Sequence, residues 1–134
     1  MLSASVDIRV RYKETDKMGV VYHANYFTWF EVARVVLLDE LGCPYADLER
    51  ADYFLPVLSC SGSFHSPAFF DDRLQVTVKI EKLPLARIEA FYEGKRKDDL
   101  IATGMTKHAF VSSKGRVVRP PEDFVALARA KFTD

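Results

Sequence analysis

A short segment near the N-terminus carries the residue types that could do chemistry. It places a carboxylate at Asp16, a glycine at Gly19 and a histidine at His23 directly before a stretch with helical spacing. The unpaired N–H groups and the positive dipole end of a helix N-terminus stabilise a bound anion, or an oxyanion that develops on an attacked carbonyl. A carboxylate beside them can act as a general base on water or as a nucleophile. Taken alone, Asp16 also suits a turn or a helix cap, and His23 suits a hydrogen-bonded structural role.

The element that must position these residues is a helix predicted over residues 22–41. Its apolar positions follow one another by three or four residues, while the charged ones fall largely elsewhere on the helical wheel. The apolar positions are Tyr26, Phe30, Ala33, Leu37 and Leu41. Gly42 and the following Pro44 end the helix. A helix of about four turns with this composition is long and apolar enough to be wrapped by a sheet.

The rest of the chain is predicted to supply that sheet. Period-two alternation indicates strands over 6–13 and 74–81, and extended runs follow at 54–64, 88–94 and 100–111. Pro56 and Gly62 suggest an edge strand with a bulge or a close backbone approach. Residues 47–52 read as a polar connection, and a short terminal helix is expected after Pro121. One strand, one long helix and a four-strand meander predict an α+β domain with the helix on one face of an antiparallel sheet.

Composition narrows the classes of partner. The 134 residues, which we expect to form a single domain over 1–134, contain 19 Lys plus Arg and 19 Asp plus Glu, so no global charge favours nucleic acid or an anionic membrane. No apolar run could span a membrane and no secretory leader is visible, so we expect a cytoplasmic protein without membrane insertion. Cys43 and Cys60 have no zinc-site or disulfide-framework spacing and are expected to be buried reduced thiols.

The order of residues around Asp16 matches a known signature. Asp16, Gly19, His23, Asn25 and Tyr26 follow the pattern D-x-x-G-V-V-x-H-x-N-Y, and F-E-x-A-R follows from residue 30. This resembles the hotdog-fold acyl-CoA thioesterases of the 4-hydroxybenzoyl-CoA thioesterase family, especially the YbgC-like branch. Weaker similarities at 56–60, 67–72 and 117–122 extend the resemblance over most of the chain.

The resemblance implies a single hotdog domain, in which a strongly curved sheet of about five strands wraps the long helix. It implies hydrolysis of an acyl-CoA or acyl-carrier-protein thioester, short-chain or aromatic, with no metal or organic cofactor. Asp16 falls on the catalytic carboxylate, as base or nucleophile, and His23 falls on the histidine beside it, where the backbone N–H is the candidate oxyanion donor. The candidate substrate-binding residues are Gly19, Tyr22, Asn25 and Arg87.

Basic residues at two predicted turns could hold the phosphates and adenosine of coenzyme A through charge-assisted contacts. They are Lys79, Lys82 and Arg87 at one turn, and Lys95, Arg96 and Lys97 at the next. The alternative for each of them is a solvent-exposed side chain at a turn that binds no ligand.

Two other functions stay open. A hotdog dehydratase or hydratase would need an acid on the helix, and Glu31 is the available one, although a local pair with Arg34 also explains it. A non-catalytic acyl-binding or scaffold protein is possible because fold does not fix function.

His65 and His108 are expected to be structural. Exposed strand edges predict a homodimer with a continuous sheet, which the family resemblance extends to a homotetramer, with the active site at a subunit interface.

Overall fold

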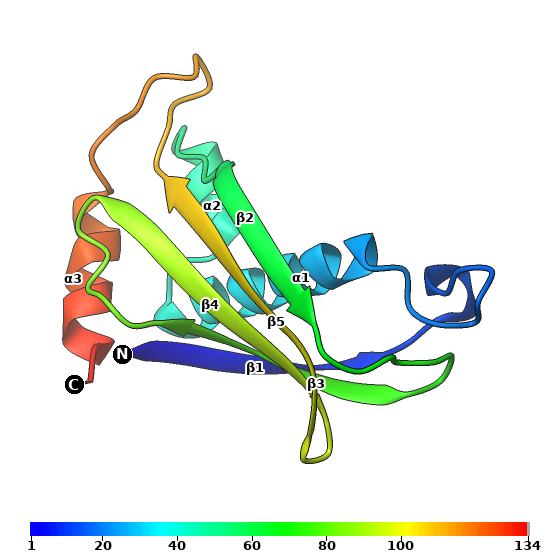
Figure 1. Cartoon of the computed structure of the whole chain (residues 1–134). Helices are drawn as coiled ribbons and strands as arrows, with labels where there is room; N and C mark the ends of the chain where they lie inside the picture. The colour runs from blue at the N-terminus through cyan, green and yellow to red at the C-terminus, as the bar shows by residue number, and fades with distance from the viewer. Residues whose placement is uncertain (134) are drawn as a thin grey trace.

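The computed structural model describes residues 1–133, whose five strands form one antiparallel sheet in the order β1-β3-β4-β5-β2. The strands are β1 (Leu2–Arg9), β2 (Val57–Phe64), β3 (Arg73–Ile80), β4 (Arg87–Arg96) and β5 (Asp99–Ala109). The sheet curves around the long helix α1 (Ala24–Leu41), which lies across one of its faces (Figure 1). The predicted α+β hotdog architecture is confirmed.

Helix α1 buries the face that its spacing predicted, because Tyr26, Phe30, Ala33, Leu37 and Leu41 are all buried. It ends where expected. Gly42 has a φ of +92° and donates its N–H to the carbonyl of Asp39, and a side chain at this left-handed position would be strained.

A glycine on the sheet lets α1 approach closely. The ring of Phe30 stacks on Tyr92 of β4, with 4.5 Å between ring centroids. A Cβ on Gly104 of β5 would lie 2.4 Å from Cε2 of Phe30. The absence of a side chain at Gly104 therefore sets how near the middle of α1 lies to the sheet.

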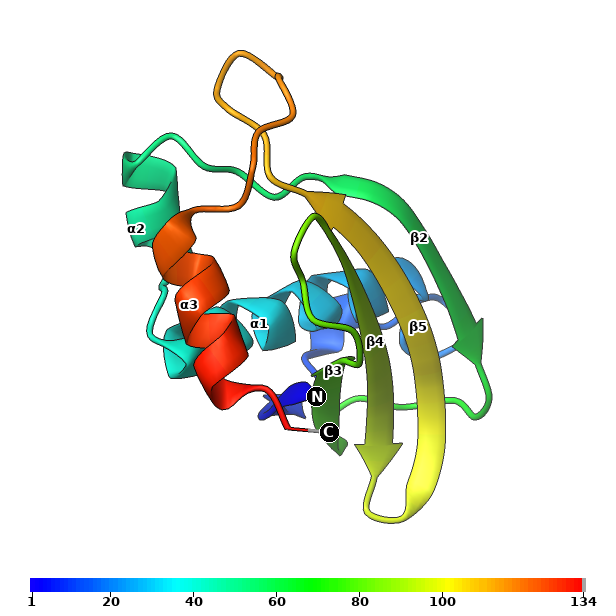
Figure 2. The same cartoon turned by 90° about the vertical axis from the view of Figure 1, so that its left-hand side faces the viewer.

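Two shorter helices cover one end of the molecule (Figure 2). They are α2 (Tyr45–Arg50) and α3 (Glu122–Lys131). The start of α3 directly after Pro121 confirms the predicted terminal helix, and its Phe124 packs edge-on against Phe110 at 5.0 Å between centroids. Helix α2 was missed, because its six residues bury only Leu48 and so leave no periodic pattern in the sequence.

The first strand is displaced from its predicted range of 6–13. It begins at Leu2 and ends at Arg9, because β3 pairs with it from Leu2 opposite Ile80 to Arg9 opposite Arg73. Tyr12, which lies within the predicted strand, instead begins a short 3₁₀ helix, η1 (Tyr12–Glu14), and is exposed.

The predicted four-strand meander is wrong in its first strand. Strands β3, β4 and β5 do follow one another, but β2 pairs with β5 at the far edge of the sheet. Local alternation does not specify which strand a segment will pair with, so the sequence could not reveal this crossing. The edge position suggested by Pro56 is confirmed, with a register shift between Val57 and Ser59, and a Cβ on Gly62 would lie 3.2 Å from Cζ of Phe27.

Within the described residues, no helix combines the length and apolarity that crossing a bilayer requires.

Candidate active site

The segment from Glu14 to Tyr22 forms a small hairpin that presents Asp16 before α1. The Asp16 N–H donates to the carbonyl of Val20 at 2.8 Å, and the Gly19 N–H donates to the carbonyl of Asp16 at 2.9 Å. Gly19 has a φ of +82° with open space around it, so its role is to allow the turn rather than to leave room for a neighbour. The next backbone hydrogen bond away from the turn is donated by the Tyr22 N–H to the carbonyl of Glu14.

This hairpin is held against a second loop. The Val21 N–H donates to the carbonyl of Ala68 at 2.8 Å, and Val20 forms an isolated bridge with Phe69. The loop before β3 therefore supports the turn that carries Asp16.

The carboxylate of Asp16 faces solvent. Its Oδ1 accepts a hydrogen bond from the N–H of Met18 at 2.9 Å, which orients the side chain over the turn. Among residues 1–133, no other group hydrogen-bonds to this carboxylate, so Oδ2 is available to a water molecule or a substrate.

The start of α1 is uncapped. His23 precedes the first helical residue and its side chain makes no capping bond. Within the described chain, the N–H groups of His23 and Ala24 have no acceptor, whereas the N–H of Asn25 donates to the carbonyl of Tyr22. Two backbone donors at the positive end of an 18-residue helix are thus unpaired.

An aromatic wall borders these donors. The ring of His23 lies 4.6 Å from that of exposed Tyr22 and 5.9 Å from that of Phe64 on β2, measured between centroids. His23 makes no hydrogen bond to Asp16 among residues 1–133, so the two side chains are positioned separately by the hairpin and the helix start.

Glu14 is a residue beside the candidate site that sequence reasoning missed. Its side chain is 4% exposed and accepts hydrogen bonds from the N–H of Arg11 at 2.7 Å and from the indole N–H of Trp29 at 3.0 Å. Burial raises the pKa of Glu14, but the hydrogen bonds from Arg11 and Trp29 lower it more, so the group is held ionised. The side chain joins the Asp16 hairpin to α1. Its separation of fifteen residues from Trp29 left no local signal.

Asn25 strengthens the same connection. Its side-chain Nδ2 donates to the backbone carbonyl of Glu14 at 2.8 Å. This bond holds the loop to the start of α1, and substrate contact by Asn25 stays a prediction.

The expected pair between Glu31 and Arg34 is not formed. Nη1 of Arg34 donates instead to the hydroxyl of Tyr92 at 3.1 Å, and no salt bridge in residues 1–133 includes either side chain. Glu31 also lies eight residues along α1 from His23, a rise of about 12 Å. Nothing here favours Glu31 as the acid of a dehydratase.

Arg87 does not join the other candidate residues within one chain. It begins β4, whereas Arg96 at the other end of β4 contacts the carbonyl of Pro67 and the carboxylate of Asp72, beside the loop that supports Asp16. The two ends of this strand are roughly 30 Å apart. Within one chain, Arg87 therefore lies far from the Asp16 hairpin. The guanidinium of Arg96 already binds groups of the fold, and its hydrogen bonds to Asp72 and Asp99 raise its pKa.

The remaining histidines and the cysteines differ in their burial. His108 is buried on β5 and hydrogen-bonded, and His65 follows β2 and contacts the hydroxyl of Thr103.

Both cysteines are free, but the expectation that both are buried is wrong, because Cys60 is exposed on the edge strand β2. In the described part of the chain, no cluster of three or more His, Cys, Asp or Glu side chains could hold a metal ion.

Comparison with known proteins places this geometry in a family. A model of the Thioesterase-like superfamily matches residues 10–128. The structure of a DHNA-CoA thioesterase from Staphylococcus aureus is 36% identical, covers 89% of this chain and 81% of its own, and superposes with a TM-score of 0.84. Protein TT1821 of Thermus thermophilus is 32% identical over 98% of this chain and 99% of its own, with a TM-score of 0.91.

A curated relative supports the same family. YneP of Bacillus subtilis, provisionally named an acyl-CoA thioesterase, is 43% identical over 75 residues, and this match spans 56% of the chain but only about half of YneP, 54%. The family model, in contrast, runs through the Asp16 hairpin, α1 and all strands from β2 to β5. The chain therefore belongs to the Thioesterase-like superfamily.

Proposed function

We propose that this protein is an acyl-CoA thioesterase that hydrolyses a short-chain or aromatic acyl thioester of coenzyme A, or of an acyl carrier protein, to the free acid and thiol. The observation that carries the proposal is the pairing of a solvent-facing Asp16 carboxylate with unpaired N–H groups at the start of α1. Membership of the Thioesterase-like superfamily supports it.

The N–H groups of His23 and Ala24 would receive the thioester oxygen. As the carbonyl carbon is attacked, negative charge develops on that oxygen, and two backbone donors at a helix N-terminus stabilise the charge. Because no protein group occupies these donors among residues 1–133, they need not break a hydrogen bond to receive the oxygen.

Asp16 would supply the base or the nucleophile. As a base, it takes a proton from water, the resulting hydroxide adds to the carbonyl carbon, and collapse of the intermediate breaks the carbon–sulfur bond. As a nucleophile, its carboxylate forms an acyl anhydride and releases the thiolate, and water then cleaves the anhydride. Both routes consume one water and yield one acid and one thiol. The imidazole of His23, beside Tyr22, would line the approach of the thioester.

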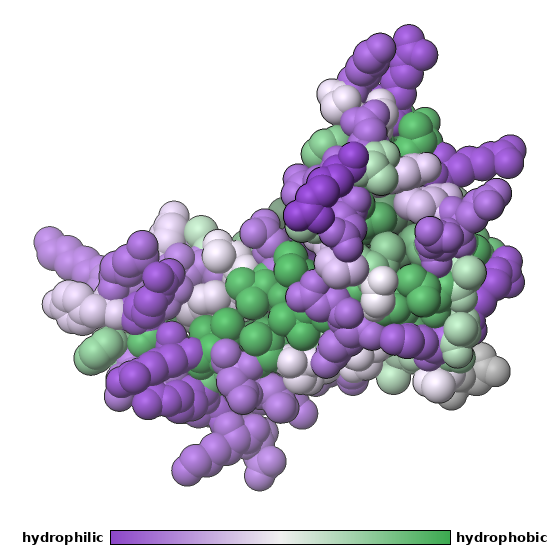
Figure 3. All heavy atoms as spheres, turned by 180° about the vertical axis from the view of Figure 1, so that it is seen from behind, coloured by the Kyte–Doolittle hydropathy of each residue, from purple (hydrophilic) through white to green (hydrophobic). Residues whose placement is uncertain are grey.

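A second copy of the chain would complete the site. Strand β2 is an edge strand, and its large apolar side chains Val57, Leu58 and Phe64 are exposed. On the neighbouring helix face, Val32 and Val35 are also exposed, and a hydrophobic band crosses the molecule on the side that α1 occupies (Figure 3). Pairing of β2 with its copy would cover both features and continue the sheet. Arg87 of a neighbouring copy would then be a candidate for holding the coenzyme A phosphates.

Replacement of Asp16 by Asn tests the proposal. Thiol release from short aliphatic, long aliphatic and aromatic thioesters of coenzyme A and of an acyl carrier protein is measured for both proteins, and Asp16→Asn should lower kcat at least about a hundredfold. Lys17→Gln, one residue along the same turn, is the control and should keep most of the activity. A folded Asp16→Asn variant that remains active would overturn the role of Asp16, and a wild type inactive on every thioester would overturn the hydrolase.

A further inference from the structure

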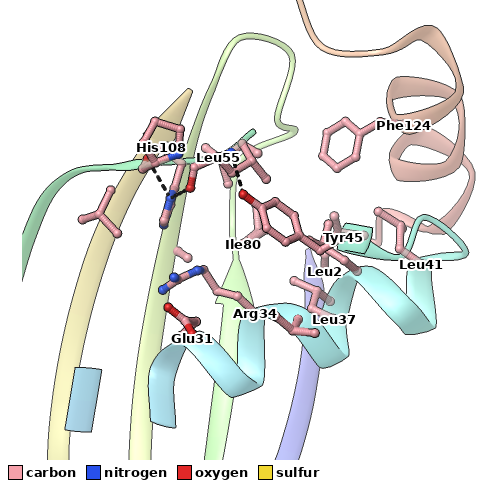
Figure 4. A pocket seen from close by; sticks show the side chains of 16 residues that line it. Leu2, Glu31, Arg34, Leu37, Leu41, Tyr45, Leu55, Ile80, His108 and Phe124 are labelled. Atoms are coloured by element: carbon pink, nitrogen blue, oxygen red, sulfur yellow. Dashed lines mark hydrogen bonds between the residues drawn. The ribbon is translucent and has the colours of Figure 1, made fainter. Parts of the chain in front are cut away.

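A cavity lies away from the Asp16 hairpin, between the C-terminal half of α1 and the sheet (Figure 4). Its volume is about 340 Å³. Most of its wall is apolar, with Leu37 and Leu41 from α1, Ile80 and Ile88 from the sheet, and Phe124 from α3. Glu31, the lining residue nearest the start of α1, is about 12 Å along the helix from His23, so in one chain the two sites are separate.

One charged group on this wall has unused hydrogen-bonding capacity. Arg34 is half-buried and lines the cavity, and within residues 1–133 its guanidinium makes a single hydrogen bond, to the hydroxyl of Tyr92. No acidic side chain in residues 1–133 forms a salt bridge with it. A guanidinium has five N–H donors, so most of its donors remain available to a ligand.

The buried partners of Arg34 hold it in place. Nδ1 of His108 faces the carbonyls of Leu55 and Pro56 and must therefore donate, which leaves Nε2 to accept from the hydroxyl of Thr106 at 2.8 Å. The oxygen of Thr106 then accepts from the hydroxyl of Tyr92 at 2.6 Å.

The direction of these hydrogen bonds is therefore fixed: Tyr92 donates to Thr106, and Thr106 donates to His108. The oxygen of Tyr92 is left to accept, and the bond from Arg34 satisfies it. Swinging Arg34 out to solvent would leave this buried acceptor unpaired, so the guanidinium is preorganised beside the cavity.

We propose that this cavity binds the carboxylate of a medium-chain fatty acid, with the carboxylate on Arg34 and the alkyl chain along Leu37 and Leu41 toward Phe124. A guanidinium pairs with a carboxylate through two parallel hydrogen bonds, and the apolar wall accounts for the rest of the ligand. From Arg34 to Leu41 the helix rises about 10 Å, which suits an alkyl chain the length of octanoate. A single cation in an apolar wall does not suit the polyphosphate of coenzyme A.

The ligand is of the same chemical class as the acid released by thioester hydrolysis, but the proposal goes beyond the proposed function and does not depend on it. Within one chain, the cavity is lined by neither Asp16 nor the start of α1. If the protein binds octanoate here but hydrolyses no thioester, the binding proposal stands and the proposed thioesterase function is wrong. If it hydrolyses thioesters but does not bind octanoate, the thioesterase function stands and the binding proposal is wrong.

Glu31 supplies a matched control on the same wall. Its carboxylate is exposed and repels an incoming anion, so Glu31→Gln should keep or tighten octanoate binding, whereas Arg34→Met should weaken it. Because Arg34→Met also takes a donor from Tyr92, a second variant is needed that leaves the hydrogen-bond chain intact. Ala90→Leu fills the cavity from β4 and should abolish binding while Arg34 stays in place.

Calorimetric titration of the intact protein, in its solution oligomer, tests the proposal with octanoate and with 1-octanol. Octanoate should bind once per chain, at least about tenfold more tightly than octanol, and Arg34→Met should remove that difference. Asp16→Asn should bind octanoate as wild type does. No binding by wild type, equal binding by Arg34→Met, or unchanged binding by folded Ala90→Leu would each overturn the proposal.

Discussion

Glu14 shows how a single buried carboxylate can position a site it need not touch. Its side chain binds Arg11, which precedes η1, and Trp29 in α1, and its backbone carbonyl accepts from Asn25 and Tyr22. Its pKa is lowered from the ordinary 4.5, so its folded-state value lies below the unfolded one. The stabilisation is therefore complete above about pH 4.5 and is lost as the pH falls toward the folded-state value.

Truncation of this side chain should affect both stability and turnover. Glu14→Ala leaves the indole N–H of Trp29 and the N–H of Arg11 without their acceptor, and should lower the free energy of unfolding by roughly 3 kcal/mol. Glu14→Gln still offers an acceptor oxygen and should lose less. Urea denaturation measures the first effect. In the proposed thioesterase, the kcat of Glu14→Ala should fall more than its KM rises, with partial rescue in Glu14→Gln. Unchanged stability in Glu14→Ala would contradict the connecting role.

His108 should make stability depend on pH. Burial and the charge of Arg34 lower the pKa of His108 from its ordinary 6.5, so the unfolded chain takes up its proton first as the pH falls. The contribution of neutral His108 is present above about pH 6.5 and is lost below it. Protonated Nε2 would also meet Thr106 as a second donor, against the direction of the hydrogen-bond chain.

A non-titrating variant isolates this effect. His108→Asn can still donate to the carbonyls of Leu55 and Pro56 but offers no acceptor to Thr106, so at pH 7.5 it should cost about 1–3 kcal/mol. The gap to wild type should narrow between pH 7 and pH 5, because only wild type loses stability there through position 108. Unfolding free energies across that range provide the measurement, and a constant gap would refute the assignment.

Between elements, Gly104 determines the approach of α1 to the sheet. A methyl group there would overlap the ring of Phe30, which cannot move aside because it is stacked on Tyr92. The position is therefore constrained by packing rather than by backbone conformation.

Gly104→Ala should accordingly destabilise the protein by about 1–3 kcal/mol, the usual cost of overpacking a core. Gly94→Ala on β4 is the matched control, because a Cβ there meets only the carbonyl of Ala102 at an ordinary 3.9 Å. Thermal melts of the two variants should differ clearly, with Gly94→Ala near wild type. Equal melting temperatures would show that α1 can shift to accommodate the methyl group.

For the whole molecule, the uncovered surface predicts assembly. Val32 and Val35 on α1 are each 37% exposed, and every residue of the edge strand β2 is exposed. Val35 lines the same cavity as Val57 of β2. Monomers that leave such an edge open tend to associate, and two copies joined through β2 would bury it.

Light scattering after size-exclusion chromatography should give wild type a mass of two chains or more. Val32→Glu should reduce that mass, because it places a charge inside the proposed contact, and in the proposed thioesterase it should also reduce activity. Val117→Glu makes the same change at an exposed valine in the loop after β5 and should leave the mass unaltered. A monomeric wild type, or the same mass for both variants, would count against the dimer.

The sequence by itself determined the features that depend on neighbours along the chain. The spacing of Phe30 and Leu37 predicted the buried face of α1, Gly42 predicted its end, and the order from Asp16 to His23 predicted a carboxylate before a helix start. Each of these follows from local backbone geometry, in which residues a few positions apart share a face or a turn.

Only the tertiary structure decided which distant residues meet. The edge position of β2 beside β5, the contact of Glu14 with Trp29, and the bond from Arg34 to Tyr92 join segments that local patterns treat separately. Arg34 is the sharpest case, since its spacing from Glu31 predicted a local ion pair and the fold gave it a partner 58 residues away. An exposed ion pair contributes little free energy, whereas a buried hydroxyl left without its partner costs much more, so packing overrides the local preference.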